Sequence, residues 1–379
     1  MNYKVFAIRF VRRLRQTSIY HLIKKVKFLL LSPFITNRLS MDYEDARNLL
    51  NSYRPNPNSS SIHENIIAPE PLYDLTVVVP CYNVAPYVGD CVKSILNQET
   101  SYKYKVILID DGSIDDTRKI IDCFSGNRDV TIIHQQNNGL SNARNQGIYH
   151  IESKYITFVD ADDCLVPEAI QKLLETAYAE NADIVEGSHY RMYNEKVVPS
   201  VKHDSVVVND NYEDFIGMPW GKVFRSTLFQ NVIFPEKLLF EDSICSFLLY
   251  PAASKNVTIS EYVYVYRIVS NSITHSSGKK VQSIDTIWIT ELMLKEHEEL
   301  KLDRGEKYSS LCIKQIVLNY YRMKKLPKEI QRAAFIVTCE IFGKYCQSLN
   351  FTLEEDYLVR SLKELDYGKY KLFCETRCN

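Results

Sequence analysis

The stretch that sets the fold is LTVVVPCYNVAPYVGDCVKSILNQETSYKYKVILIDDGS, residues 75–113. It contains two apolar, β-branched runs, 75–79 and 106–109, and Pro80 stops the first. Short apolar runs bounded by turn signals are typical of strands that are buried on both faces. The residues between them, 87–97, have the apolar spacing of a helix. The order strand, helix, strand predicts a parallel sheet with a helical crossover.

The same alternation continues along the chain. Further segments with regular spacing lie at 115–124 (helix), 130–134 (strand), 140–150 (helix), 155–159 (strand), 167–181 (helix) and 184–186 (strand). We therefore expect an α/β fold over residues 71–280, with a mainly parallel sheet flanked by helices. Ligands of such sheets bind beyond the carboxyl ends of the strands, so the polar residues after each strand are the first candidates for a site.

The two flanks differ from this central part. Residues 1–40 hold nine Lys and Arg and no acidic residue, with apolar residues at three- and four-residue spacing. This pattern predicts a basic amphipathic helix, which either lies on an anionic membrane surface or docks on the body of the protein. We take 1–70 as this arm and its linker, and 281–379 as a C-terminal helical region whose role stays open.

Composition excludes several classes of protein. Of the 379 residues, 45% are hydrophobic and 25% charged, as in globular proteins. The 339 residues after the arm carry a net charge of −10, which argues against nucleic-acid binding. The ten cysteines form no C-x-x-C pair, and no apolar run approaches the ~18 residues of a membrane span. We therefore expect a cytoplasmic protein, peripheral at the inner face of the membrane if the arm binds lipid.

Polar clusters follow three of the predicted strands: PCYN at 80–83, DDGS at 110–113 and DADD at 160–163. Five acids gathered at one edge would repel one another unless a divalent cation lay between them. An Asp-x-Asp can present two carboxylates to one Mg²⁺ or Mn²⁺, and no His/Cys cluster for zinc occurs. The alternative is that these acids only cap helices, Asp163 before Pro167 and Asp115 before Thr117.

Together these motifs resemble the inverting glycosyltransferases of family 2, which have the GT-A fold, a Rossmann-like sheet flanked by helices. The resemblance covers about 75–276 and leaves the first 70 and last 100 residues uncovered. Its motifs, in the expected order, are VVVPCYN (77–83), IDDGSIDDT (109–117), NNGLSNARNQG (137–147), FVDADD (158–163), MPWGKVFR (218–225), FEDS (240–243) and YRIVSNSIT (266–274).

The resemblance assigns roles on the donor side. Pro80, Tyr82 and Asn83 would surround the nucleoside, and Asp111 or its neighbour Asp110 would accept a hydrogen bond from the base. Arg144 would lie near the base or the diphosphate. Asp160 and Asp162 would bind the metal, with Asp162 as the direct ligand. Arg267, Ser272 and His275 would belong to a loop over the diphosphate. The implied cofactor is Mn²⁺ or Mg²⁺.

The resemblance also assigns roles on the acceptor side. Asp242 would be the general base, and Trp220, Gly221, Lys222 and Glu241 would line the acceptor. The residues alone leave other interpretations open. Trp220 could be a core aromatic, Glu241 and Asp242 a solvated pair that begins a helix, and Arg267 a partner in a surface ion pair. We interpret Cys81, which follows Pro80, as a packing residue.

The resulting hypothesis is an inverting, metal-dependent hexosyl- or N-acetylhexosaminyltransferase. Its donor would be a nucleotide-sugar, in the first place a UDP-sugar. Its acceptor would be a lipid-linked glycan in the assembly of capsule, O-antigen or exopolysaccharide. Alternatives are a soluble polyol-phosphate or protein acceptor, or a degenerate binding module on the same fold. A nucleotidyltransferase is disfavoured because no Gly-rich basic loop follows the first strand, and a dehydrogenase because no G-x-G-x-x-G occurs. The oligomeric state stays open.

Overall fold

The computed structural model describes residues 24, 26–28, 30–64, 70–204, 206–208, 215–269, 280–352 and 355–377. The chain divides into two compact units. The sheet unit consists of residues 56–275 and 288–303. The helical unit combines residues up to 55 with 276–287 and with the residues from 304 onward, so segments from both ends of the chain belong to it. Residues 1–23 of the predicted basic arm lie outside the described residues.

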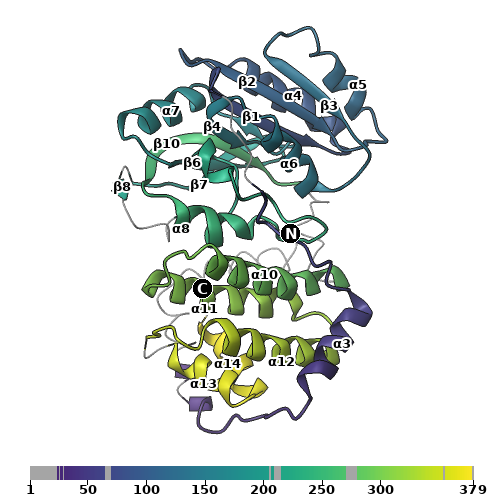
Figure 1. The fold of residues 1–379 in the computed structure, drawn as a ribbon, viewed down its shortest axis with the longest axis vertical. Coiled ribbons are helices and arrows are strands. Elements are labelled where there is room, and N and C mark those ends of the chain that lie inside the picture. Colours follow the sequence, from purple (N-terminus) through teal and green to yellow (C-terminus); the bar gives the residue numbers. More distant parts are fainter. Residues whose placement is uncertain are drawn as a thin grey trace, which may run out of the picture. The chain divides into compact units, whose positions relative to one another are not determined.

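The sheet unit is built on a ten-stranded mixed sheet (Figure 1). Its main path runs β3-β2-β1-β4-β9-β6-β10-β5, with β7 beside β6 and β8 beside β10. The first four strands of the chain pair in parallel, whereas β9 is antiparallel to both of its neighbours. The strands are Tyr73–Cys81 (β1), Tyr104–Asp110 (β2), Val130–His134 (β3), Ser153–Phe158 (β4), Cys164–Leu165 (β5), Ile184–Tyr193 (β6), Lys196–Val201 (β7), Val206–Val208 (β8), Lys222–Arg225 (β9) and Asn256–Arg267 (β10).

Helices connect the parallel strands, as the alternation in the sequence predicts. In the sheet unit they are Ala85–Leu96 (α4), Thr117–Asp122 (α5), Leu140–Tyr149 (α6), Ala169–Ala179 (α7), the 3-10 helix Ser226–Phe229 (η1), the π-helix Cys245–Leu249 (η2) and Tyr250–Ala252 (α8). Five strands were not predicted from the sequence: β5, β7, β8, β9 and β10. β5, β8 and β9 have at most four residues, too few for a clear alternation, whereas β10 contains an alternation of Tyr and Val at 262–266 that is typical of a strand.

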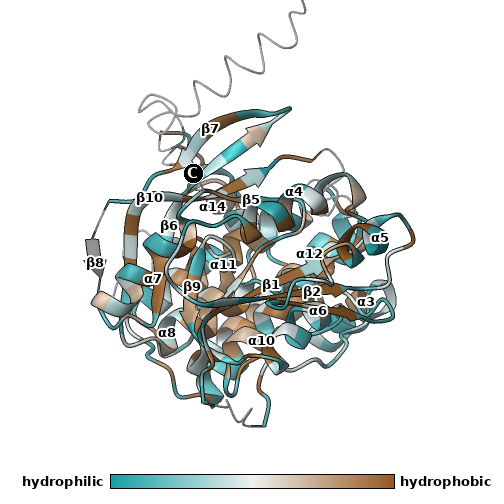
Figure 2. Cartoon of the chain, turned by 90° about the horizontal axis from the view of Figure 1, so that it is seen from above, coloured by the Kyte–Doolittle hydropathy of each residue, from teal (hydrophilic) through white to brown (hydrophobic). Residues whose placement is uncertain are grey.

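The core explains why the central strands form where they do. In β1 every residue from Thr76 to Cys81 is buried, including Pro80, which lies inside the strand rather than beyond it. Full burial of a Val or Leu side chain contributes about 1.5–3 kcal/mol to the stability of the fold. Such apolar runs therefore stabilise the centre of the sheet (Figure 2). α6 packs directly on β1, because a Cβ on Gly147 would lie 2.3 Å from a Val78 methyl carbon.

The helical unit consists of helices from both ends of the chain and a short N-terminal segment (Figure 1). A partly buried ion pair joins its parts: Arg54 donates two hydrogen bonds, of 2.7 and 2.8 Å, to the fully buried Asp285. No helix among the described residues is long and apolar enough to cross a membrane. The elements of the helical unit are Tyr43–Tyr53 (α3), Val281–Ile284 (η4), the start of Asp285–Glu299 (α10), Glu306–Met323 (α11), Lys328–Tyr345 (α12), Asp356–Lys363 (α13) and Tyr367–Arg377 (α14).

Candidate functional site

The carboxyl ends of β1, β2 and β4 lie side by side at one edge of the sheet. Val78 of β1 pairs with Phe158 of β4, and Cys81 of β1 pairs with Asp110 of β2. The polar clusters that follow these strands therefore meet at this edge, as the sequence predicts. We call 80–83, 110–113 and 160–163 the first, second and third strand-end loops.

The first two strand-end loops are tied together by hydrogen bonds. Asn83 has a left-handed backbone, with φ of 51°, and its N–H donates to Ser113 Oγ at 3.1 Å. The Asp111 N–H donates to Cys81 O at 2.9 Å. Cys81 itself is buried, and burial raises the pKa of its thiol, in agreement with a packing role. Tyr82 is 47% exposed, so its ring is open to a ligand beside a fixed backbone.

Asp110 and Asp111 are both buried, and both hold neighbouring backbone in place. Asp110 Oδ1 accepts the Ser113 N–H at 3.0 Å, and Asp110 Oδ2 lies 3.1 Å from His134 Nδ1. Asp111 accepts three hydrogen bonds of 2.7, 2.8 and 2.9 Å from segment 135–139. A carboxylate offers about four acceptor positions, and these three hydrogen bonds occupy three of them.

The third strand-end loop carries three carboxylates with different surroundings. Asp163 is buried, and its two oxygens accept the Tyr264 O–H at 2.8 Å and the Arg267 N–H at 2.7 Å. The helix-capping alternative for Asp163 is therefore wrong. Asp160 and Asp162 are only partly buried. Burial, and after it the charge of Asp160, raises the pKa of Asp162 to about 6, which marks a crowding of negative charge.

Arg144, on α6, joins the third strand-end loop to the FEDS motif. Its guanidinium donates to Asp160 Oδ1 at 2.9 Å and to Glu241 Oε1 at 2.8 Å. The side chain is 3% exposed, and the guanidinium lies 5.2 Å from the centroid of the Phe234 ring. Burial lowers the pKa of Arg144, but the two carboxylates outweigh burial and hold the pKa above its ordinary value. Arg144 thus stays charged in the interior between two acids.

Asp242 follows Glu241 just before the π-helix η2. The Glu241 side chain is 13% exposed and paired with Arg144, so the solvated-pair interpretation is wrong for Glu241. Asp242 is partly buried, and Phe240, two residues earlier, has a left-handed backbone with φ of 67°. Backbone outliers of this kind and π-helical turns both cluster at functional sites.

Trp220 packs on two tyrosines of β10. Its ring stacks on Tyr264 at 4.6 Å and on Tyr266 at 5.4 Å, with interplanar angles of 11° and 10°. Only 6% of Trp220 is exposed, so core packing, the alternative considered above, accounts for its contacts. Gly221 has φ of 72°, which favours glycine, and it turns the chain into β9.

Lys222 has no exposed surface, which corrects the acceptor-lining role expected for it. Its ammonium donates to the Glu186 carboxylate, to Ile216 O at 2.7 Å and to Tyr250 Oη at 2.6 Å. His203 Nε2 lies 2.9 Å from the other oxygen of Glu186. A buried charge is tolerated only when it is paired and hydrogen-bonded. Lys222 therefore holds β6, β9 and α8 together in the interior of the sheet unit.

Arg267, the last residue of β10, contacts the third strand-end loop. Its Nε donates to Asp162 O at 2.8 Å, and its guanidinium lies 5.1 Å from the centroid of the Tyr87 ring. Its guanidinium also lies 3.9 Å from the carboxylate of Asp90, which is 67% exposed, so the surface ion pair considered above forms beside the contact with the loop. Ser272 and His275, which the resemblance places over the diphosphate, lie outside the described residues.

The sequence did not indicate that Tyr264 belongs to the site, nor that Asp163 is buried and accepts its hydrogen bond. Tyr264 sits on β10, 101 residues along the chain from Asp163, so no local spacing connects the two. The signal that was present is the alternation of Tyr and Val at 262–266, which is typical of a strand. Within the described residues, no group of three or more His, Cys, Asp and Glu side chains is arranged to hold a metal ion.

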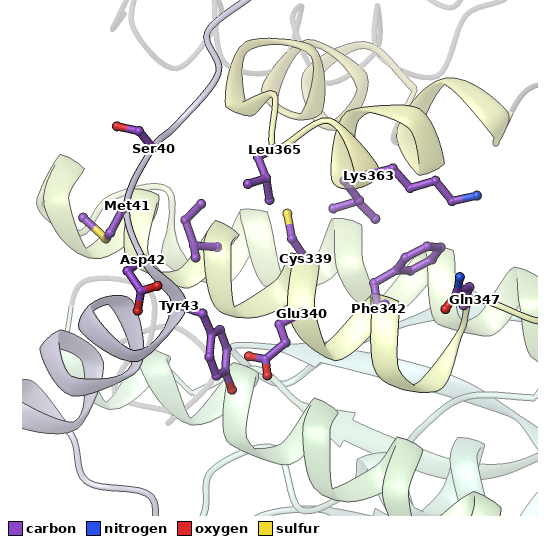
Figure 3. Close-up of a pocket in the computed structure, with 13 residues that line it drawn as sticks. Ser40, Met41, Asp42, Tyr43, Cys339, Glu340, Phe342, Gln347, Lys363 and Leu365 are labelled. Carbon is purple, nitrogen blue, oxygen red and sulfur yellow. The ribbon is translucent and has the colours of Figure 1, made fainter.

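The helical unit contains a separate pocket of about 770 Å³ (Figure 3). It is bounded by residues 40–43, by α12 and by the end of α13. Apolar side chains such as Phe342 and Leu365 line it together with polar ones such as Glu340 and Lys363. None of the residues predicted from the sequence lines this pocket, and it forms no part of the strand-end site.

Comparison with known proteins places the sheet unit in a family. A family model described as glycosyl transferase family 2 matches residues 76–235. Glycosyltransferase GlyG of Streptococcus pneumoniae is 34% identical over 221 residues, which cover 52% of this chain and 72% of that protein. The uncharacterized glycosyltransferase EpsJ of Bacillus subtilis is 32% identical over 217 residues, covering 53% of this chain and 62% of EpsJ. The match thus spans less than two thirds of EpsJ.

A solved structure has the same fold. The crystal structure of S. aureus TarS 1–349 in complex with UDP-GlcNAc aligns with a TM-score of 0.66 over 80% of this chain and 91% of that chain. The two sequences are 18% identical over this alignment.

Proposed function

The chain belongs to glycosyltransferase family 2 and has a GT-A-like fold, and on that premise we propose that it is an inverting, metal-dependent transferase. Its donor is a nucleotide-sugar and its acceptor a glycan hydroxyl. One observation carries the proposal: buried Arg144 binds both Asp160 of the third strand-end loop and Glu241, the neighbour of Asp242. The UDP-GlcNAc bound to TarS supports a UDP-sugar as the first donor to test.

The acidic residues of the third strand-end loop fit a divalent cation. Asp160 and Asp162 are two residues apart, and burial together with the Asp160 charge raises the pKa of Asp162 to about 6. Mg²⁺ and Mn²⁺ are commonly held by one or two carboxylates with substrate phosphates completing the coordination. Asp160 and Asp162 are therefore the residues that would hold the ion. When bound, it neutralises negative charge on the leaving diphosphate.

Asp242 is the proposed general base. The acceptor oxygen bonds to the anomeric carbon, the bond from that carbon to the diphosphate oxygen breaks, and the hydroxyl proton passes to the Asp242 carboxylate. Attack from the face opposite the leaving group inverts the anomeric centre. Arg144 lies close enough to Asp242 to interact with its charge, and it pins the adjacent Glu241. The base is thereby kept beside the donor-side carboxylates.

Calorimetric titration of UDP and GDP into the purified chain, with and without Mn²⁺, tests the donor site. We expect Mn²⁺-dependent binding of one nucleotide, because a divalent cation can be bound by the third-loop carboxylates and the diphosphate together. Asp162→Ala should abolish this binding. Asp116→Ala, which removes a 69% exposed carboxylate of the same unit, should not change it. If neither nucleotide binds in the presence of Mn²⁺, the proposal fails.

The acceptor and the location are further parts of the proposal. The start of the helical unit has large apolar side chains that are 36–83% exposed, and we call them the apolar edge: Val26, Leu30, Leu31 and Phe34. Phe28 instead packs on Tyr357 and Phe373, with ring centroids 4.7 and 6.4 Å apart. Phe28 thus holds the segment while the apolar edge faces outward.

Residues 1–40 carry nine basic and no acidic residues, so a surface in contact with the apolar edge should be apolar and anionic. An anionic bilayer has both properties. We infer that the edge docks the enzyme at the inner face of the membrane. A lipid-linked glycan of capsule, O-antigen or exopolysaccharide assembly is then the acceptor within reach.

Flotation with phosphatidylglycerol vesicles tests the docking. The double variant Leu30→Ser/Phe34→Ser should bind at least about tenfold more weakly, because each buried apolar side chain contributes roughly 1.5–3 kcal/mol. Leu72→Ser removes a 63% exposed leucine of the sheet unit and is the matched control, with binding expected to be unchanged. Equal flotation of the double variant and wild type would refute the role of the edge.

A further inference from the structure

The third strand-end loop is closed by one buried hydroxyl group. Tyr264, on β10, has no exposed surface. Its oxygen accepts the Asp160 N–H at 3.1 Å, and its O–H donates to Asp163 Oδ2 at 2.8 Å. The loop also closes on itself, because the Asp163 N–H donates to Asp160 O at 2.9 Å. Tyr264 therefore contacts both ends of the four-residue loop.

Two further contacts from the same strand complete the clamp. The Arg267 N–H donates to Asp163 Oδ1 at 2.7 Å, and the Arg267 Nε donates to Asp162 O at 2.8 Å. Both Asp163 oxygens are thus occupied, and the residue is 1% exposed. Asp163 serves to hold the loop, whereas the partly buried Asp160 and Asp162 remain the carboxylates available to a ligand.

The Tyr264 ring extends this clamp to a second part of the site. Trp220 stacks on it at 4.6 Å with an interplanar angle of 11°. Beside Trp220, a Cβ added to Gly221 would lie 3.6 Å from Tyr264 Cβ, so the turn before β9 also packs on this side chain. One side chain thus touches the acidic loop through its hydroxyl and the Trp220 segment through its ring.

We propose that Tyr264 is a positioning residue: its hydroxyl, acting through Asp163, fixes the third strand-end loop so that Asp160 and Asp162 are preorganised for the donor. The inference rests on the donor site proposed above. It predicts that Tyr264 matters for nucleotide binding although it does not reach the ligand, and that Asp163 matters for its hydrogen bonds and not for its charge.

The chain offers a matched control for the loss of a buried hydroxyl. Tyr155, on β4, is also fully buried, and its O–H lies 3.1 Å from Ala177 O and 3.0 Å from Ala182 O, away from the acidic loop. Tyr155→Phe and Tyr264→Phe each remove one bonded hydroxyl from the same unit. A merely structural role for Tyr264 would make the two variants behave alike.

The experiment measures Mn²⁺-dependent UDP binding by calorimetry and amide hydrogen exchange of residues 159–165 in full-length wild type and both variants. We expect Tyr264→Phe to weaken UDP binding about tenfold and to speed exchange of the Asp160 amide. Tyr155→Phe should change neither. Wild-type affinity and exchange in Tyr264→Phe would overturn the proposal. Failure of wild type to bind either UDP or GDP would count against the donor site, and hydrogen exchange alone would then decide the role of Tyr264.

A second variant guards against misfolding of the first. Asp163→Asn keeps an acceptor for the Arg267 N–H and a polar group beside the Tyr264 hydroxyl, so we expect UDP affinity within about threefold of wild type. A loss of UDP affinity as complete as in Asp162→Ala, with wild-type exchange of the Asp160 amide, would mean that the Asp163 charge itself binds the ligand, and the positioning role would be refuted.

Discussion

The second and third strand-end loops hold the same kind of residue at the same edge of one sheet, but their carboxylates have different partners. Asp110 and Asp111 are buried and face backbone and side-chain donors of their own surroundings. In the third loop both oxygens of Asp163 are held in this way. Asp160 faces the buried Arg144, and Asp162 has a pKa raised to about 6 by burial and by the Asp160 charge.

The difference teaches that a strand-end carboxylate is not a ligand site by position alone. A carboxylate whose oxygens already accept several hydrogen bonds stabilises the loop around it. A carboxylate that is crowded by another negative charge gains most from an added cation. The second loop therefore shapes the edge of the site, and the third is the part that we expect to respond to a metal and a diphosphate.

The largest expected effect concerns a carboxylate outside both loops. If both loops serve the donor side, the base must come from elsewhere, and Asp242→Asn should lower the turnover number about 10³-fold, within the range of general-base catalysis. UDP binding should be retained, because no donor ligand is removed. Radiolabelled sugar transfer and calorimetry on the same preparation check this expectation. Turnover within tenfold of wild type would remove Asp242 from the mechanism.

The stability of the two loops should respond differently when a carboxylate becomes an amide. Asp111→Asn loses acceptors for segment 135–139 and should lower the free energy of unfolding by about 2 kcal/mol. The folded-state pKa of Asp162 is raised, so its negative charge opposes folding at pH 7 and Asp162→Asn should not lower stability.

Urea denaturation at pH 7 measures both variants. Asp116→Asn, at a 69% exposed carboxylate, serves as the neutral control. The comparison between the loops would be wrong if Asp162→Asn were the less stable of the two loop variants.

Local patterns predicted the sheet and the meeting of the strand-end loops. Apolar runs such as 75–79 and 106–109 mark buried strands, and parallel pairing then brings the residues after them to one edge. The family and its GT-A fold were predicted in another way, by the resemblance of the motifs between 77 and 274 to family 2. The sheet itself needed only neighbouring residues and the rules of parallel pairing.

Long-range contacts were beyond such reasoning. Arg144 meets Glu241 across 97 residues, and Tyr264 meets Asp163 across 101. Lys222 shows the reverse case, because its place in a motif suggested an exposed role, whereas a buried carboxylate from β6 binds its ammonium. Whether a charged side chain faces a ligand or a buried partner depends on the tertiary structure around it. The spacing of residues within a motif gives no information about this tertiary environment.

The smallest expected effect lies at the outer rim of the second loop, where one imidazole meets two carboxylates. His134 Nδ1 lies 3.1 Å from buried Asp110, and His134 Nε2 lies 3.0 Å from Asp122, which is 49% exposed. Even an exposed pair of full charges contributes only about 0–1 kcal/mol, because water and salt screen it. Asp122→Asn should therefore change the free energy of unfolding by less than about 0.5 kcal/mol, in urea denaturation at low and high salt. A loss that exceeds that of Asp111→Asn would mean that the exposed carboxylate, and not the buried ones, fixes the second loop.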